Sequence, residues 1–479
     1  MIIKFKIILL LLSLTPILVK GQGAVGWLNE EKSIDSVSKW SYDDHSAVYP
    51  KIRQFSDVKL GFGIGNKSQL LPTIDAGLQY GTKLNYRAGA GFIWESNFSP
   101  KWYLRAGMNL IINDGDSLLA SNYFQSLGNS TLKLQPTARL AFTPNKHFNF
   151  QTGIDRNFIG DGSRSLFLSD YGKSYPFAQV RTKFWHVEYT MLYQFMRENF
   201  QNQNRSKFLA THHLSWNATK WLNFGLFETV VFQPKDTLLN RGFDVEYLNP
   251  LVFYRPQEYS IGSSDNVLIG ASFSVKFLNR TMFYGQVIVD EFLLSEIRNR
   301  RGWWGNKFGG QLGYKGKMKF LKQNFIFRLE VNAVRPYTYA HLNSLANYGN
   351  QGSTLSHPLG ANFAEILGEL KWQHQRVFVK AVAVFGYQGW DMNGYSYGSD
   401  IYRPYTQRPY DYHLQIGEGE RNYFGRLNLF GAYQLSEKGD LQAFGEVQLR
   451  FDSAAQDHKF RVVPMIGIRS NLLNDYRNY

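Results

Sequence analysis

The chain has 479 residues, of which 44% are hydrophobic and 16% aromatic, and it has no cysteine. The missing cysteine excludes a disulfide framework, a lipid-anchored lipoprotein and any cysteine-based metal site or nucleophile. The formal net charge of +15 is compatible with nucleic acid, lipopolysaccharide or acidic polysaccharide as a partner, and equally with a pore lined by basic side chains. Beyond the first 21 residues no apolar stretch is long enough for a membrane-spanning helix, which needs about 20 residues.

Residues 1–21 have the pattern of a secretory signal peptide, with a basic start, an apolar run over residues 7–19 and a small residue, Gly21, at the expected cleavage point. The run is too short for a membrane anchor. This segment contains three lysines and no acidic residue, so its removal lowers the net charge from +15 to +12. An exported protein seldom meets nucleic acid, and we therefore expect a glycan or lipid partner. Residues 22–66 are predicted to be an N-terminal periplasmic or plug segment.

Residues 67–479 are predicted to form one domain, because apolar side chains recur there at every second position, as in strands with two different faces. In one segment, Phe327, Leu329 and Val331 alternate with polar residues such as Arg328. Such segments run for about 10 to 14 residues, close to the 9 to 11 needed to cross a bilayer at a tilt. Eighteen are predicted, at 71–80, 83–96, 101–112, 131–144, 147–156, 176–183, 186–198, 207–218, 220–233, 263–278, 281–291, 306–318, 323–335, 362–373, 375–388, 421–435, 439–452 and 458–470.

The connections between these segments alternate between short turns and a second set that is mostly long, as a closed membrane barrel requires. The long ones are 113–130, 157–175, 234–262, 292–305, 336–361 and 389–420. We therefore predict an all-β fold, a transmembrane antiparallel β-barrel of about 18 strands in the bacterial outer membrane, with the long loops extracellular and both termini periplasmic. A lumen of that size is wide enough for an aqueous channel unless residues 22–66 or inward-folded loops fill it.

The long loops combine arginine with tryptophan and tyrosine. Aromatic faces stack on sugar rings, and guanidinium groups pair with carboxylates or phosphates. The candidates for polysaccharide binding are Arg164, Tyr254, Arg255, Arg298, Arg300, Arg301, Trp303 and Trp304. The alternative interpretation is an aromatic girdle at the membrane boundary, whose arginines touch lipid headgroups. The sequence leaves both interpretations open.

An enzymatic function has weak support in the sequence. His212 and His213 are adjacent on a predicted strand, so their side chains point to opposite faces and cannot share a metal ion. Inward charges such as Arg328 and Glu330 are interpreted as a structural network of the lumen, not as groups for acid–base chemistry. We expect no catalytic residue, no metal site and no cofactor.

Four blocks of sequence, mostly in the predicted loops, resemble a known family. They are 157–170 (NFIGDGSRSLFLSD), 247–266 (YLNPLVFYRPQEYSIGSSDN), 290–313 (DEFLLSEIRNRRGWWGNKFGGQLG) and the pair 334–341 and 357–362 (VRPYTYAH and HPLGAN). Together they resemble the RemB-type gliding motility proteins of Bacteroidetes, which are similar to the Wzi-like capsule assembly proteins. The Wzi-like relationship implies an eighteen-stranded barrel with a plugged lumen, acting as a surface lectin that holds capsular polysaccharide. The RemB-like relationship implies a mobile surface component of gliding. Neither relationship transfers a site residue.

The leading hypothesis is a non-enzymatic surface protein that binds or anchors capsular polysaccharide or exopolysaccharide and takes part in capsule assembly or gliding motility. Its expected partners are outer-membrane lipid and lipopolysaccharide, acidic polysaccharide, and the gliding or capsule-export machinery, but not nucleic acid. A porin or transporter is the first alternative, and a barrel hydrolase is the second.

Overall fold

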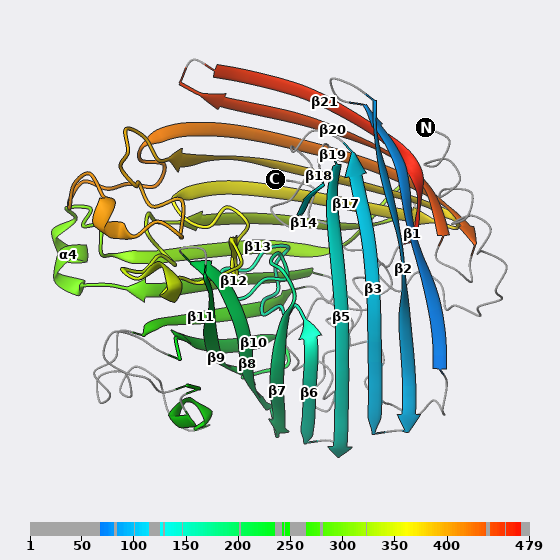
Figure 1. Cartoon of the computed structure of the whole chain (residues 1–479), viewed down its shortest axis with the longest axis horizontal. Coiled ribbons are helices and arrows are strands. Elements are labelled where there is room, and N and C mark those ends of the chain that lie inside the picture. The colour runs from blue at the N-terminus through cyan, green and yellow to red at the C-terminus, as the bar shows by residue number, and fades with distance from the viewer. Residues whose placement is uncertain are drawn as a thin grey trace.

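A computed structural model shows a closed antiparallel barrel, to which most of the described strands belong (Figure 1). The structure describes residues 68–80, 84–99, 101–114, 125–127, 130–145, 147–200, 203–234, 242–243, 245–249, 265–277, 281–321, 323–436, 441–455 and 457–470. The predicted signal peptide, 1–21, and the predicted N-terminal segment, 22–66, lie outside the described residues. Among the residues that are described, no helix is long and apolar enough to cross a membrane.

Each strand of the barrel wall pairs with the next along the chain, and β1 pairs with β21 to close the ring. Within the described ranges, 18 strands form this wall: β1 (Ser68–Tyr80), β2 (Leu84–Ser99), β3 (Trp102–Asp114), β5 (Ser130–Asn145), β6 (Phe148–Asp155), β7 (Tyr175–Phe184), β8 (Val187–Phe200), β9 (Gln203–Asn217), β10 (Leu222–Phe232), β11 (Asn266–Phe277), β12 (Thr281–Glu291), β13 (Lys307–Phe320), β14 (Gln323–Val334), β17 (Phe363–His374), β18 (Val377–Trp390), β19 (Glu420–Ser436), β20 (Leu441–Ala454) and β21 (Asp457–Ser470).

The connections contain short elements of their own. β4 (Gln125–Leu127) pairs with the start of β5, and β15 (Gly349–Asn350) pairs with β16 (Ser353–Thr354). The helical turns are η2 (Val245–Leu248), α4 (Leu294–Asn299), η3 (Ser344–Ala346) and η4 (Tyr405–Gln407).

The predicted barrel of 18 strands is confirmed. The largest difference at a strand end is four residues, at the strand predicted from residue 207 and observed from Gln203. The alternation of short turns and mostly long connections is confirmed as well, so the long connections all lie at one end of the barrel. We call this end the loop end.

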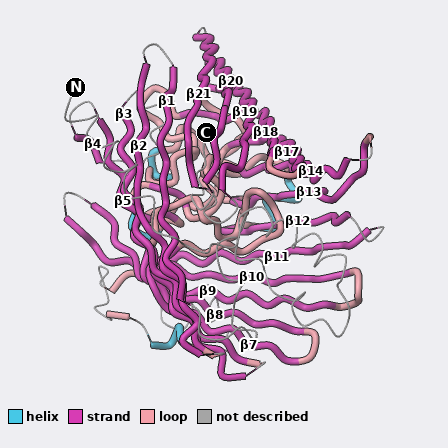
Figure 2. Tube along the Cα trace, turned by 90° about the vertical axis from the view of Figure 1, so that its right-hand side faces the viewer, coloured by secondary structure: helices cyan, strands magenta, loops and turns pink. Residues whose placement is uncertain are grey.

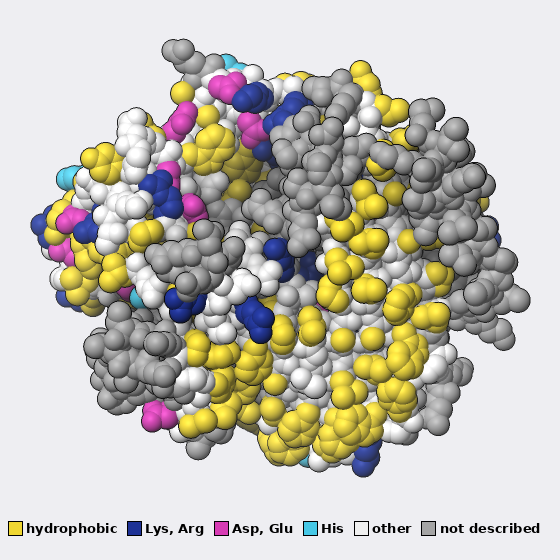
Figure 3. Space-filling model, viewed as in Figure 1, with side chains coloured by type: hydrophobic (Ala, Val, Ile, Leu, Met, Phe, Trp, Pro, Cys, Tyr) yellow, Lys and Arg dark blue, Asp and Glu magenta, His cyan; other side chains and the backbone are white. Residues whose placement is uncertain are grey.

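The side chains of the wall alternate between an apolar outer face and an inner face that is largely polar. In β14, Leu329 and Val331 are exposed on the outside, whereas their sequence neighbours Arg328 and Glu330 are buried inside. A broad band of hydrophobic side chains accordingly covers the part of the wall seen in Figure 3. A lipid bilayer cannot satisfy the free edge of a sheet, so a closed wall with an apolar exterior is what a membrane requires. The protein is an outer-membrane β-barrel.

Two of the long connections fold into the barrel. We call residues 156–174, between β6 and β7, the first plug loop, and residues 335–362, between β14 and β17, the second plug loop. Loop segments lie within the ring of strands in Figure 2. Both loops contribute to one buried hydrophobic cluster with the inner wall, the first through Phe167 and Leu168 and the second through Tyr339 and Leu355. The lumen therefore contains a packed core at its loop end.

Candidate functional site

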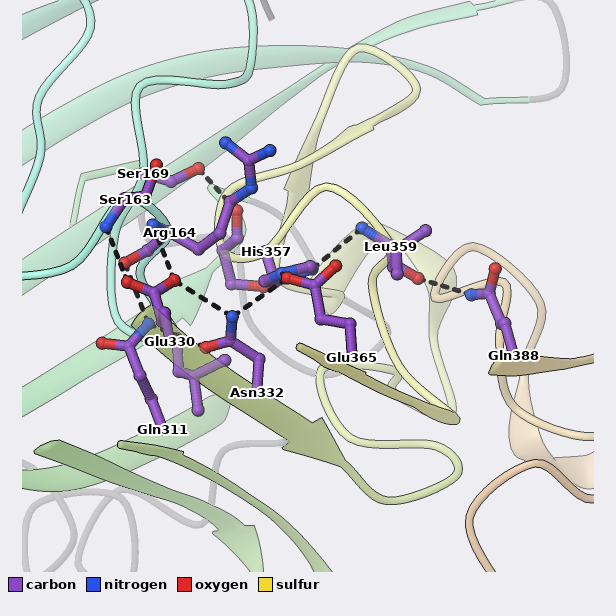
Figure 4. A network of polar contacts seen from close by, with 12 residues as sticks. Ser163, Arg164, Ser169, Gln311, Glu330, Asn332, His357, Leu359, Glu365 and Gln388 are labelled. Carbon is purple, nitrogen blue, oxygen red and sulfur yellow. Dashed lines mark hydrogen bonds and ion pairs between the residues drawn. The ribbon is translucent and has the colours of Figure 1, made fainter. Parts of the chain in front are cut away.

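Glu330 of β14 fastens the first plug loop to the wall (Figure 4). Its carboxylate accepts hydrogen bonds from the backbone N–H of Ser163 at 2.7 Å and of Arg164 at 3.1 Å. The hydroxyl of Tyr284 donates to the same carboxylate at 2.7 Å. The Nε2 of Gln311 donates to the Arg164 carbonyl oxygen at 3.0 Å. The tip of the loop is thus held by side chains of three neighbouring wall strands, β12, β13 and β14.

The same network extends to the second plug loop. The amide of Asn332 donates to Glu330 and to Glu365, both at 3.0 Å. Glu365 Oε1 also lies 2.8 Å from Nε2 of His357, which belongs to the second plug loop. The imidazole ring of His357 stacks on Phe363, with ring centroids 4.3 Å apart. Two inward carboxylates of the wall, one on β14 and one on β17, therefore anchor both plug loops.

Two further loops cover the plug at the loop end. We call residues 292–306 the α4 loop and residues 391–419 the tyrosine-rich loop. Backbone hydrogen bonds of 2.7–3.0 Å join residues 301–304 to residues 411–414, so the two loops form one layer.

Asn362, the last residue of the second plug loop, ties that layer to the plug. Its backbone has a φ of 58°, in the left-handed region that asparagine tolerates better than most residues. Its side-chain amide donates to the carbonyl oxygens of Tyr397 and Glu418, both at 2.9 Å. Its Oδ1 accepts from the Gly417 N–H at 2.7 Å. One side chain therefore holds two segments of the tyrosine-rich loop.

Aromatic rings and cations gather around Trp304 in a group that we call the cation–aromatic cluster: Trp304, Lys307, Tyr405 and Arg408. The guanidinium carbon of Arg408 lies 4.2 Å from a ring centroid of Trp304, and the Tyr405 ring lies 4.7 Å from Trp304. Lys307 is buried, with its Nζ 4.2 Å from the Tyr405 centroid and 3.2 Å from Glu291 Oε2. Burial, followed by the charge of Glu291, raises the pKa of Tyr405 to about 12. Its hydroxyl, which is protonated at neutral pH like that of any tyrosine, therefore stays protonated to higher pH and can donate a hydrogen bond.

The outer surface of this layer offers partly exposed arginines and tyrosines. Arg301, Arg403 and Arg408 each form a salt bridge with a neighbouring carboxylate, those of Glu296, Asp391 and Asp411 respectively. Tyr395 and Tyr410 are exposed beside them. Aromatic faces can stack on sugar rings, and arginine–carboxylate pairs can exchange hydrogen bonds with hydroxyl and carboxylate groups. The layer is therefore suited chemically to binding a glycan.

No family model and no curated protein sequence matches this chain. Among solved structures, the chain is similar to Wzi of Escherichia coli, with a TM-score of 0.57 and 12% identity over 94% of this chain and 98% of that one. The two chains share the fold of the barrel. Wzi is reported as an outer membrane protein involved in group 1 capsule assembly and as a carbohydrate-binding β-barrel. OprD of Pseudomonas aeruginosa aligns with a TM-score of 0.46 and 9% identity over 88% of this chain and 98% of that one. At 12% identity the likeness to Wzi shows the fold alone.

The structure separates the predicted site residues into groups. Arg301, Trp303 and Trp304 lie together, with the tryptophan rings 5.8 Å apart and the Arg301 guanidinium carbon 4.7 Å from the ring centroid of Tyr412. Arg298 and Arg300 are exposed at the end of α4. The other three candidates are placed elsewhere: Arg164 is buried inside the barrel, and Tyr254 and Arg255 lie outside the described residues.

Sequence reasoning did not single out Lys307, Tyr405 and Arg408. A signal for two of them exists, because the triplet Arg-Pro-Tyr occurs three times, at 335–337, 403–405 and 408–410. All three triplets meet at Trp304. Its ring lies 6.2 Å from Tyr337 and 4.7 Å from Tyr405, and Arg408 stacks on it.

Proposed function

We propose that this protein is a non-enzymatic surface protein that binds an acidic capsular polysaccharide or exopolysaccharide at its loop end. The observation that carries the proposal is the layer of paired arginines and aromatic rings around Trp304, which lies over a lumen filled by folded loops. Wzi, which shares the fold, is reported to bind carbohydrate, and this supports the same class of ligand.

An acidic glycan suits the charges of the loop layer. Arg301 and Arg403 remain partly exposed although each is paired with a carboxylate of the protein. A carboxylate on the ligand can share or replace these partners without a change in the fold. The net charge of +12 expected for the mature chain also favours the approach of an acidic polymer, and this attraction weakens as salt is added.

We also propose that the loop end faces the exterior and that both termini face the periplasm, as in bacterial barrels with short periplasmic turns. A glycan bound there is retained on the cell surface. Capsule retention and gliding motility, the roles implied by the Wzi-like and RemB-type resemblances, are both consistent with such a tether. The capsule-export or gliding machinery is then the expected cellular partner.

A general porin is less consistent with the lumen. The first and second plug loops share a hydrophobic cluster with the wall and are held by Glu330 and Glu365. We expect the purified protein to be silent in planar lipid bilayers. A steady, large conductance would contradict the plugged, glycan-binding barrel.

A binding experiment tests the glycan site directly. The protein in lipid nanodiscs is titrated with purified acidic polysaccharide from the parent bacterium, alongside Trp304→Ala and Arg408→Ala. A stacking or cation–π contact contributes about 0.5–2 kcal/mol, so each variant should bind about 2- to 30-fold more weakly. Trp221→Ala is the control, because Trp221 is an exposed tryptophan at a short turn of the opposite end. The proposal would be overturned if neither the unmodified protein nor Trp221→Ala bound the polysaccharide. It would also be overturned if all four proteins bound the polysaccharide equally.

The cellular role is tested by deletion of the gene, followed by capsule staining and colony-spreading assays. Loss of surface polysaccharide points to capsule retention, and loss of spreading with an intact capsule points to gliding. Normal results in both assays would leave the proposed role without support.

A further inference from the structure

The α4 loop has a second exposed surface, which contains no residue of the cation–aromatic cluster. Four apolar side chains there, those of Phe292, Leu293, Leu294 and Ile297, are 47%, 47%, 51% and 41% exposed. Leu294 and Ile297 are three residues apart in the helix and lie on the same side of it. A contiguous apolar patch on an exposed loop usually marks a surface that another molecule covers.

This patch continues the lipid-facing surface of the barrel. Phe292 follows directly on Glu291, the last residue of β12. Below it on the outer wall, Val287 of β12 and Phe308 and Leu312 of β13 are exposed as well. α4 lies at the loop ends of these strands, at the left edge of Figure 1. The apolar exterior therefore extends past the ends of the strands onto the helix.

Two cations border the patch. Arg298 follows Leu294 by four residues and so lies on the same side of the helix, and Arg300 ends the helix with a left-handed φ of 52°. Both are exposed, and neither has an ion pair with any residue that the structure describes. Arg301 differs, because it pairs with Glu296 and stacks on Tyr412. At this edge of Figure 3, hydrophobic side chains adjoin Lys and Arg side chains.

We propose that α4 is an interfacial anchor, whose apolar side chains insert into the outer leaflet while Arg298 and Arg300 bind the phosphate groups of its lipids. A short amphipathic segment with apolar residues on one side and basic residues beside them lies in the plane of a membrane interface. Arginine binds phosphate through a bidentate pair of hydrogen bonds. The anchor is independent of glycan binding and holds the loop layer at a fixed height above the membrane.

Charge and continuity favour lipid over other occupants. In a symmetric contact between two copies, the same patch would face itself, and the arginines of one copy would approach those of the other. A polysaccharide would find no hydrogen-bonding groups on the four aliphatic and aromatic side chains. An anionic lipid surface satisfies both the apolar side chains and the arginines.

The natural absence of cysteine allows one nitroxide label to be placed at a chosen position. Leu294→Cys is labelled in vesicles that contain lipopolysaccharide, and collision with oxygen and with a water-soluble nickel chelate is measured by electron paramagnetic resonance. Two controls have matched exposure: Leu312→Cys on the lipid-facing wall and Tyr395→Cys in the tyrosine-rich loop, at 53% and 51% against 51% for Leu294. We expect the label at Leu294 to resemble that at Leu312, with high oxygen and low chelate accessibility.

The arginines are tested in the same labelled protein. Arg298→Ala combined with Arg300→Ala should raise chelate accessibility at Leu294 in vesicles of phosphate-rich lipopolysaccharide, and have less effect in vesicles of zwitterionic phosphatidylcholine. A label at Leu294 that behaves like the one at Tyr395 would overturn the anchor. So would spin–spin broadening that grows with protein density, which would indicate a second copy, or protection that appears only after soluble polysaccharide is added. None of these outcomes depends on whether Trp304→Ala impairs glycan binding.

Discussion

Replacing Glu330 by alanine should release the tip of the first plug loop while the barrel wall stays intact. The carboxylate accepts four hydrogen bonds, from the backbone N–H groups of Ser163 and Arg164 and from the side chains of Tyr284 and Asn332. Each buried donor that loses its acceptor costs about 1–3 kcal/mol. The two backbone N–H groups alone then account for about 2–6 kcal/mol, which corresponds to at least about 30-fold more frequent opening of the tip.

Hydrogen exchange followed by mass spectrometry measures this opening. In Glu330→Ala, peptides that cover residues 161–164 should exchange at least about 30-fold faster than in the parent, and wall peptides should be unchanged. Glu446→Ala is the matched control. Glu446 is an inward, buried carboxylate on β20 that accepts hydrogen bonds from the wall side chains Asn428 and Gln448. Equal exchange in Glu330→Ala and the parent, or an equally open tip in Glu446→Ala, would refute the reasoning.

Three further substitutions probe how the loops are held. Asn362→Asp places a negative charge against the carbonyl oxygens that accept hydrogen bonds from the Asn362 amide. We therefore expect faster proteolysis of the tyrosine-rich loop in this variant than in Asn362→Gly, which keeps the positive φ. Lys207→Met removes the buried 2.6 Å hydrogen bond to Asn347, and the unpaired amide oxygen should lower the free energy of unfolding by about 1–3 kcal/mol in denaturant titrations. Burial, the largest cause, lowers the pKa of His341 below its ordinary 6.5, and its Nδ1 accepts the Asn343 N–H. The stabilisation from neutral His341 is then present above that ordinary value and lost as the pH falls through the folded pKa. The protection of the Asn343 amide, measured as its exchange rate relative to the intrinsic rate at each pH, should therefore fall on acidification, and His341→Gln should remove this dependence.

The strands could be predicted from the sequence because the membrane imposes their pattern. Lipid on one side and lumen on the other make apolar and polar side chains alternate along each strand, as at Arg328, Leu329 and Glu330 of β14. The turns could be predicted because short connections leave little freedom. The bounds therefore agree to within four residues.

The plug could not be predicted in the same way, because its contacts join residues that are far apart in the chain. Ser163 and Glu330 are separated by 167 positions. The composition of the loop made Arg164 a reasonable candidate for polysaccharide binding. Its side chain is buried, however, and its backbone N–H donates a hydrogen bond to Glu330 within the network. Gly162, which precedes Ser163 and Arg164, is required by a close approach that only the structure reveals. A Cβ at Gly162 would lie 2.5 Å from Glu330 Oε2, so the loop could not approach the wall so closely.

The composition of the loops also could not show which arginines share a site. Arg298 and Arg301 are three residues apart, but one is exposed beside an apolar patch and the other is paired with Glu296. The difference arises because the tyrosine-rich loop packs against residues 301–304 and not against the exposed side of α4. We therefore propose the two interpretations left open by the sequence, glycan binding and headgroup contact, for different arginines of one loop.

The hydrophobic part of the plug determines whether the lumen can open at all. The first plug loop places Ile159, Leu166, Phe167 and Leu168 in the buried cluster, and the Phe167 ring stacks on Phe227 of the wall at 4.6 Å. Burial of such a side chain contributes about 1.5–3 kcal/mol, so the four together contribute about 6–12 kcal/mol. This stabilisation is at least as large as the about 2–6 kcal/mol that Glu330→Ala should remove through the two backbone N–H groups. The variant should therefore show a loosened tip and still no conductance, because a polymer or solute could pass only after the cluster had been exposed to water. We therefore expect a glycan that reaches the loop end of this barrel to stay at the surface and not to enter the lumen.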